Sequence, residues 1–256
     1  MKFHGQSSDH ATGPAFSPRV VVLKRDRLYG DFICRQIKEL WRDAAVQVFQ
    51  LGKVALAAIR ATDPDLFISG VNIEDMDGLE HLEPFAHARL PILVVTSRKE
   101  ARTFEMLRAL RFEGLYDGHA EGMENLPLAL QQVIQRKRYV SPTMVEHLKH
   151  PKRIRRDELT EREQVVLAAL GDGTDDTLAA FRLGISPHTV STHRKSIMAK
   201  LGLHHKGELI LYALQRGYVW VTPEEIFYPG FKRRLRTREV STNILHGKAI
   251  TKSCGT

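Results

Sequence analysis

Residues 187–201 carry the side chains of this sequence that are best suited to contacting another molecule. Val190, Ile197 and Leu201 have the spacing of one face of a helix, so we expect them to point into a core. The other positions carry hydroxyl groups and cations, which can donate hydrogen bonds to base edges and phosphates in the major groove of B-DNA. The candidate DNA-binding residues on this surface are Thr189, Ser191, Thr192, Arg194, Lys195 and Lys200.

A helix can present these side chains only if neighbouring elements hold it in place, and residues 159–221 contain the signals for four helices. The first begins at a capping box at residues 160–163. Ser186 favours the start of the third helix and Gly202 favours its end, while Gly184 lies in the turn before it. Two short helices joined by a tight turn, the second of them basic, predict a helix-turn-helix. The last three helices are expected at about 174–182, 187–201 and 206–216.

Residues 159–221 resemble the DNA-binding domain of the LuxR/NarL class of transcription regulators, also called the FixJ class. The resemblance implies that the third helix is the recognition helix, that His193 joins the candidate DNA-binding residues, and that the partner is double-stranded DNA. It also implies that the fourth helix makes a dimer contact. The residues that carry the resemblance are Leu159, Thr160, Arg162, Glu163, Val166, Leu167, Gly173, Ala180, Leu183, Ile185, Ser186, Thr189, Val190, His193, Ile197, Lys200, Leu201 and Gly202.

Several positions depart from the pattern of this class. Ser191 stands where the class usually has lysine, and Ser196 stands where it usually has asparagine. Asp175 and Asp176 stand at the start of the second helix, where they would either repel DNA phosphates or stabilise the helix N-terminus through its dipole. The usual sequence preference of the class is therefore not expected to carry over.

The N-terminal part of the chain has a different organisation, in which short apolar runs alternate with segments of helical periodicity. This alternation predicts an α/β domain with a five-stranded parallel sheet and helices on both faces. In such a domain the functional groups lie in loops at the carboxyl ends of the strands. The expected strands are Val20–Leu23, Ala45–Phe49, Leu66–Ser69, Pro91–Thr96 and Gly114–Tyr116.

Residues 19–136 resemble a response-regulator receiver domain, which has the flavodoxin-like fold. Residues 64–68, 76–80 and 91–96 carry the resemblance, together with residues 139–142 after the domain. The resemblance implies an acidic cluster that holds Mg²⁺ and an aspartate that accepts a phosphoryl group at the end of the third strand. It also implies a threonine or serine switch and a lysine.

Most of these groups are missing from this chain. The acidic pair falls on Lys24 and Arg25, the phosphate acceptor on Gly70, and the lysine near Gly118. Thr96 alone is kept, at the switch position. Two cations in place of the metal ligands and no acceptor carboxylate predict a degenerate phosphorylation site, and thus a pseudo-receiver.

A receiver without this chemistry could dimerise the chain, bind another protein or bind a small anion. Lys24 and Arg25 would suit an anion, because they follow a strand at its carboxyl end, where helix N-termini also favour negative charge. The alternative is a pair of ordinary surface cations.

The chain has 256 residues and a formal net charge of +8, and most of the excess positive charge lies beyond residue 150. Residues 1–18 are polar and are expected to form a flexible tail. Residues 137–158 are interpreted as a basic linker, or else as a solvated charge run. Residues 222–256 form a basic C-terminal tail, either an arm that contacts phosphates or a solvated segment.

These features favour a DNA-binding transcription regulator of the two-component type, an atypical response regulator that acts as a homodimer without aspartyl phosphorylation. The alternative is a protein-interaction module that controls another regulator without specific DNA binding; Gly70 argues against an ordinary phosphorylated response regulator.

No enzyme, cofactor or metal site is expected, because the sequence shows no nucleophile–base pair or metal-ligand cluster. The sequence also lacks an apolar membrane span and a secretory signal, so a cytoplasmic location is expected. A disulfide between Cys34 and Cys254 is not expected.

Overall fold

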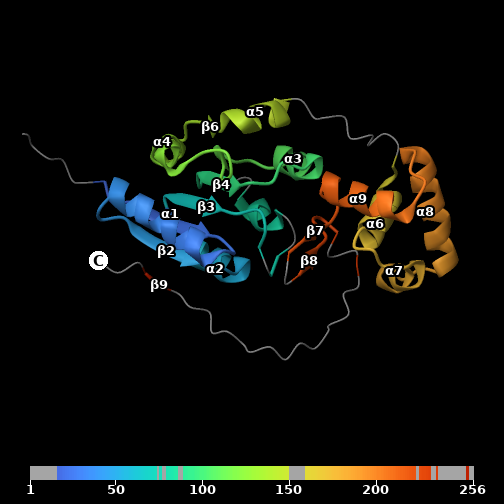
Figure 1. The fold of residues 1–256 in the computed structure, drawn as a ribbon. Helices are drawn as coiled ribbons and strands as arrows, with labels where there is room; N and C mark the ends of the chain where they lie inside the picture. The colour runs from blue at the N-terminus through green and yellow to red at the C-terminus, as the bar shows by residue number, and fades with distance from the viewer. Residues whose placement is uncertain are drawn as a thin grey trace, which may run out of the picture.

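The computed structural model describes residues 16–73, 75–76, 79–85, 89–149, 159–222, 225–231, 235 and 252–253. They form an N-terminal α/β domain and a C-terminal helical domain, and a small two-stranded sheet lies between the two (Figure 1). The predicted fold class, a receiver-like domain followed by a four-helix domain, is confirmed.

The N-terminal domain is built on a parallel sheet with the strand order β6-β5-β4-β3-β1-β2. The five expected strands are all present, and a sixth strand extends the sheet beyond β5. A short seventh strand, β9, pairs antiparallel with β2 at the opposite edge. The strands are β1 Arg19–Leu23, β2 Ala45–Phe49, β3 Leu66–Ser69, β4 Ile92–Thr96, β5 Gly114–Asp117, β6 Tyr139–Val140 and β9 Lys252–Ser253.

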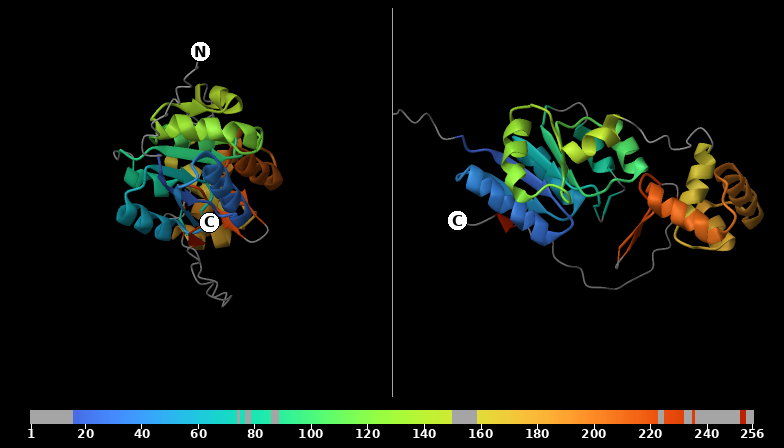
Figure 2. Two further views of the ribbon diagram at one scale, coloured as in Figure 1. Left: turned by 90° about the vertical axis from the view of Figure 1, so that its left-hand side faces the viewer. Right: turned by 45° about the horizontal axis from the view of Figure 1, so that its top comes forward.

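Helices cover both faces of this sheet (Figure 2). Val20 and Val22 belong to a buried cluster with α1 and α4, whereas Val21 and Leu23 pack with α2, η1, α3 and α5 on the other face. Burial on both faces explains why the strands are continuous apolar runs. The helices are α1 Arg27–Leu40, α2 Gly52–Thr62, η1 Glu80–Phe85, α3 Ala101–Arg108, η2 Met123–Asn125, α4 Leu126–Ile134 and α5 Pro142–Lys149, where η marks a 3₁₀-helix.

The segment that we interpreted as a basic linker, residues 137–158, is in part folded. Residues 139–140 form β6, which pairs with β5, and residues 142–149 form α5, whose Met144 is buried in the core of the N-terminal domain. Residues 150–158 lie outside the described part of the chain. The N-terminal domain therefore extends to residue 149, because apolar residues in this segment bury themselves against the sheet.

The C-terminal domain contains the four expected helices, and the local signals act as predicted. Thr160 and Glu163 form both hydrogen bonds of a capping box, Ser186 caps α8, and Gly184 and Gly202 end α7 and α8 with positive φ angles of 64° and 67°. Only glycine adopts such angles without strain. The helices are α6 Glu161–Leu170, α7 Asp176–Leu183, α8 Pro187–Leu201 and α9 Lys206–Arg216.

The segment that we interpreted as a basic C-terminal tail begins with ordered structure. Within this segment, strand β8, Ile226–Phe227, pairs antiparallel with β7, Trp220–Val221, which precedes the segment. Phe231 and Leu235 are buried in the core of the C-terminal domain. The expectation of a solvated tail or arm is wrong for these residues. Residues 232–234 and 236–251, which contain most of the basic side chains, lie outside the described residues, as do residues 1–15.

Two further expectations concern cysteine and membranes. Cys34 on α1 is disulfide-bonded, contrary to the expectation of an unbonded thiol, and the other cysteine of the sequence lies outside the described residues. Among the helices that the structure describes, none is both long and apolar enough to span a bilayer.

Candidate nucleic-acid interface and switch site

Helix α8 is held in the C-terminal domain by its apolar face. Val190 and Ile197 are completely buried and Leu201 is nearly so, as the helical spacing predicts. The Ser186 hydroxyl accepts a hydrogen bond from the amide of Thr189 at 3.1 Å and fixes the first turn. The helix lies at the end of the molecule farthest from the receiver sheet (Figure 1). Exposed residues on the rest of the helix include Thr192 and Lys195.

Arg194, a candidate DNA-binding residue, is engaged inside the domain. Its guanidinium forms a bidentate ion pair with Asp176, in which Nε lies 2.9 Å from Oδ1 and Nη2 lies 2.8 Å from Oδ2. Hydrogen bonds from Arg194 hold the pKa of the Asp176 carboxyl below its usual range. The pair fastens α8 to the start of α7 across 18 residues of sequence.

The two carboxylates at the start of α7 thus have structural partners. Asp176 is neutralised by Arg194, and Asp175 caps α7 by accepting a hydrogen bond from the amide of Leu178 at 2.7 Å. Of the two alternatives drawn from the sequence, the geometry supports stabilisation of the helix N-terminus.

Lys200, a second candidate, is bound to a buried carboxylate. Glu163 accepts hydrogen bonds from Lys200 Nζ and from Ser196 Oγ, both at 2.7 Å, in addition to its bonds within the capping box. Burial alone would raise the pKa of Glu163, but the bonds from Lys200, Ser196 and Thr160 outweigh it and lower the pKa to about 2. Glu163 therefore fastens the C-terminal half of α8 to α6.

The remaining candidates form a smaller exposed surface. Lys195 is exposed and has no hydrogen-bond or ion-pair partner within the described ranges. Thr192 lies one turn before it and is exposed, although its hydroxyl donates to the carbonyl of His188. Ser191 and His193 are half-buried on either side. Thr189 shares a hydrogen bond with Ser186 at the start of the helix.

The second group of candidates comes together at the carboxyl edge of the receiver sheet. Lys24 follows β1, Gly70 follows β3, Gly118 follows β5 and Thr96 ends β4, so all four lie at the carboxyl ends of parallel strands. Arg25 turns away from this cluster, and its guanidinium lies 5.1 Å from the ring centre of Phe227.

Lys24 lies beside Gly70, the position at which the resemblance to receivers implies a phosphate acceptor. A side chain built at Gly70 would place its Cβ 3.4 Å from Lys24 Cδ and 3.5 Å from Nζ. The ammonium donates to the carbonyl of Val95 at 3.2 Å and lies 4.6 Å from the ring centre of Tyr29. Burial lowers the pKa of Lys24 to about 8, against the opposing charge of Asp26. The ammonium thus lies at the position to which the resemblance to receivers assigns a metal ligand.

Gly118 and Thr96, two further positions of the receiver pattern, are in contact with neighbouring groups. The Tyr29 hydroxyl lies 2.6 Å from where a Cβ at Gly118 would be, so it occupies the space that a side chain at Gly118 would need. The Thr96 hydroxyl accepts a hydrogen bond from the amide of Arg98 at 3.0 Å, which ties it to its own loop.

Asp117 was missed by the sequence interpretation. It ends β5 fully buried, forms an ion pair with Lys99 at 2.7 Å, and accepts hydrogen bonds from Thr143 and from the amides of His119 and Ala120. Burial would raise its pKa, but these bonds lower it to about 2. Its position after an apolar strand was the available signal. The carboxylate is committed to a structural network, and no metal-ligand cluster occurs among the described residues.

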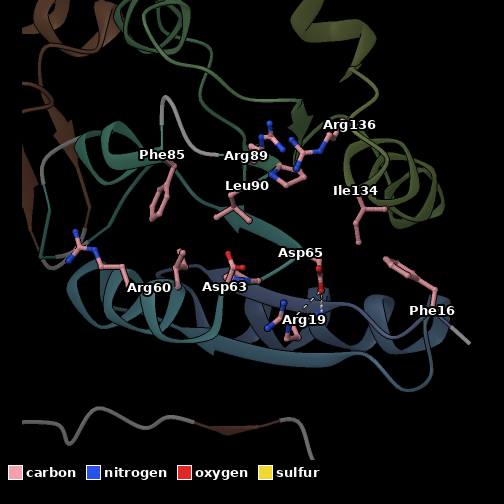
Figure 3. A pocket seen from close by; sticks show the side chains of 13 residues that line it. Phe16, Arg19, Arg60, Asp63, Asp65, Phe85, Arg89, Leu90, Ile134 and Arg136 are labelled. Carbon is pink, nitrogen blue, oxygen red and sulfur yellow. Dashed lines mark hydrogen bonds and ion pairs between the residues drawn. The ribbon is translucent and has the colours of Figure 1, made fainter. Parts of the chain in front are cut away.

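A hollow of about 590 Å³ lies at the amino ends of strands β1, β3 and β4 (Figure 3). Four arginines and two aspartates surround an apolar floor that includes Phe85 and Leu90. Arg19 is paired with Asp65 there, at 3.7 Å. The anion site expected at Lys24 and Arg25 stays a prediction. Lys24 is half-buried there and donates to the Val95 carbonyl, and Arg25 lies against Phe227.

Comparison with known proteins identifies the C-terminal domain. Residues 157–213 match the family of bacterial regulatory proteins described as the luxR family, and the match spans all of α6, α7 and α8. This domain is a LuxR-family helix-turn-helix domain.

The similarity extends into the receiver. The chain is 27% identical over 184 residues to the transcriptional regulatory protein YdfI of Bacillus subtilis, covering 66% of this chain and 83% of that protein. It is 26% identical over 211 residues to the response regulator GacA of Pseudomonas aeruginosa, covering 78% and 97%. The chain is thus homologous to response regulators of the NarL/LuxR family.

A solved structure shows the same fold. It is RcsB from Salmonella enterica serovar Typhimurium bound to promoter rprA in the presence of phosphomimetic BeF3−, with a TM-score of 0.53 and 19% identity over 77% of this chain and 98% of that one. The helix-turn-helix thus follows a receiver-like domain in both chains.

Proposed function

We propose that this chain, a DNA-binding transcription regulator of the response-regulator type, binds its operator without aspartyl phosphorylation and as a homodimer. The observation that carries the proposal is the pair of Gly70 and Lys24. Phosphoryl transfer requires an acceptor carboxylate and a metal ion that neutralises charge on the phosphoryl group. Gly70 has no carboxylate, and the ammonium of Lys24 beside it would repel a divalent cation.

The DNA-binding part of the proposal rests on α8. Lys195 and Thr192 lie exposed on the helix that the LuxR-family match implies to be the recognition helix. Arg194 and Lys200 hold the helix in place, through Asp176 and Glu163, and we assign them the role of positioning it. Fixing the helix in advance favours binding, because less conformational freedom is lost when the complex forms.

The dimer follows from the geometry of recognition. One recognition helix reads few base pairs, whereas two related by a twofold axis read half-sites about one helical turn apart. Leu211 on α9 is 54% exposed and offers an apolar contact on the helix that the family resemblance assigns to dimerisation.

One observation favours the alternative, a protein-interaction module. Because Arg194 and Lys200 are both paired within the domain, α8 presents less positive charge than its sequence suggests. Loss of phosphate contacts would weaken DNA binding at every sequence.

Recovery of genomic fragments by the purified full-length protein, with no phosphodonor present, separates the two functions. We expect a shared, roughly palindromic motif, and Lys195→Ala should bind it about tenfold or more weakly, since it removes a cation from the recognition surface. Arg35→Ala, which removes an exposed cation from α1 of the receiver, is the charge-matched control and should leave affinity unchanged. Salt-sensitive binding without a motif, equal for both variants, would favour the interaction module.

A further inference from the structure

The chain that follows α9 connects the two domains. Gly217 turns it with a positive φ of 82°, and β7 then pairs with β8, with Trp220 opposite Phe227. The Thr222 hydroxyl accepts a hydrogen bond from the amide of Glu225 at 3.0 Å and closes the turn. We call residues 218–222 and 225–231 the C-terminal clasp.

One side of the clasp belongs to the DNA-binding domain. Tyr218 and Phe231 stack with ring centres 5.9 Å apart, and both are buried in the core of that domain. The Tyr228 hydroxyl donates to Asp172 at 2.6 Å, and Asp172 also binds Arg182 of α7 at 2.6 Å. This side is thereby fixed to the helix-turn-helix.

The other side of the clasp belongs to the receiver. Trp220 is 2% exposed and packs into the same cluster as Val21, Phe67 and Phe104, so it completes the receiver core from outside the domain. The guanidinium of Arg98 lies 4.7 Å from the Trp220 ring centre. Such a contact is favourable when it is shielded from water.

Arg102 on α3 joins both sides. Its Nε donates to the carbonyl of Pro229 at 3.2 Å, and its guanidinium lies 4.1 Å from the ring centre of Phe231. Gly217 also lies against the receiver, since a Cβ there would come within 2.8 Å of Glu100 Cβ. These receiver contacts come from the loop after β4 and from α3.

That loop follows Thr96, the switch position implied by the resemblance to receivers, and neighbouring side chains of this chain bond to it. Thr96 accepts from the Arg98 amide, Lys99 pairs with Asp117, and Arg98 pairs with Glu100 at 3.0 Å. Arg98 therefore links the switch threonine to Trp220. A displacement of the loop would move the clasp with it.

We propose that the C-terminal clasp sets the position of the DNA-binding domain on the receiver, in place of a phosphorylation-driven switch. This inference rests on the proposed function. In it, contacts of the clasp fix the position of the DNA-binding domain, and phosphorylation is not needed to do so. The clasp holds the two domains in one arrangement that leaves α8 at the far end of the molecule (Figure 1). Two clasped protomers present their recognition helices at a fixed spacing.

Hydrogen exchange of the full-length protein tests the contact itself. The double variant R98A/R102A removes the two receiver arginines that contact the clasp and leaves the apolar side chains of both cores in place. The variant R35A/R60A removes two exposed arginines from α1 and α2 as a charge-matched control. We expect amides of residues 97–100 and 218–222 to exchange about tenfold or more faster in the first variant alone, with β1–β3 and α6–α9 unchanged. Unchanged exchange in either segment would contradict the proposed contact between the clasp and the receiver.

Affinity for a twofold operator compared with a single half-site tests what the clasp does. Fixed spacing raises the effective concentration of the second helix, so R98A/R102A should lower the ratio of the two affinities about tenfold while leaving half-site affinity unchanged. An unchanged ratio, with exchange accelerated, would show that the clasp does not position the domain and would overturn the proposal. Operator binding by the wild-type protein only in the presence of a phosphodonor would refute the proposed function. The hydrogen-exchange result would still show whether the clasp contacts the receiver.

Discussion

Glu163→Ala is expected to destabilise the DNA-binding domain by about 3 kcal/mol, because hydrogen bonds to charged groups are each worth about 1.5–3 kcal/mol and a helix cap about 1 kcal/mol. The substitution removes the acceptor of Lys200 and Ser196 and half of the capping box. A loss of this size is a large share of the total stability of a small domain. Urea denaturation followed by circular dichroism measures it, with the exposed Glu161→Ala of the same helix as the control.

The same carboxyl group predicts a pH dependence. Its pKa falls from the ordinary 4.5 to about 2 in the folded protein, so folding favours the ionised form. The stabilisation is complete above pH 4.5 and is lost as the pH falls from there towards 2. Glu163→Gln should lack this part of the acid transition. An equal acid response in wild type and Glu163→Gln would contradict the hydrogen-bonded arrangement around Glu163.

Lys24→Met is expected to stabilise the receiver domain by about 2 kcal/mol at neutral pH. One pKa unit corresponds to about 1.4 kcal/mol, and part of the gain is offset because the Val95 carbonyl loses its donor. The pKa of Lys24 falls from 10.5 to about 8 on folding, so the charged form is disfavoured in the core. Methionine keeps the length of the side chain and removes the ammonium.

The sign of the pH effect follows from this shift. Between pH 8 and 10.5 the unfolded chain binds more protons at Lys24 than the folded chain, so wild-type stability rises with pH across that window. The advantage of Lys24→Met should therefore shrink from pH 8 to 10.5. Urea denaturation at both ends of the window measures it, with the exposed Lys53→Met as the control. Destabilisation by Lys24→Met at pH 7 would mean that the ammonium is needed where it lies.

Features encoded within a few residues of sequence could be predicted well. The strands from Val20 to Tyr116 were visible as apolar runs, and helix ends at Thr160, Ser186 and Gly202 followed from capping chemistry that acts across three or four residues. The resemblance to receivers also predicted that Lys24 and Gly70 lie at neighbouring strand ends. In the structure, a Cβ built on Gly70 would lie 3.5 Å from Lys24 Nζ.

Features that depend on distant partners could not be predicted. Strand β6 has two residues, and it exists because it pairs with β5 across 25 residues of sequence, as Gly114 with Tyr139. The basic residues around it suggested a linker. The same error was made after residue 222, where positive charge concealed the aromatic residues that pack on both domains.

The candidate interface shows the same limit. Helical periodicity correctly placed Val190 and Ile197 in the core and the polar residues outside it. Periodicity on α8 alone gives no information about which cations have partners on α6 and α7. The pairing of Arg194 with Asp176 depends on how two helices cross, and it is the reason why we propose a positioning role for Arg194.

We expect this regulator to bind DNA without a phosphoryl group. Operator affinity of the full-length protein should be measured with and without beryllofluoride and Mg²⁺, a stable mimic of the phosphoryl group, using the motif recovered from genomic fragments. We predict the same affinity in both conditions, because Gly70 offers no carboxylate and the ammonium of Lys24 lies beside it. A marked rise in affinity with beryllofluoride, abolished when Mg²⁺ is withheld, would contradict it.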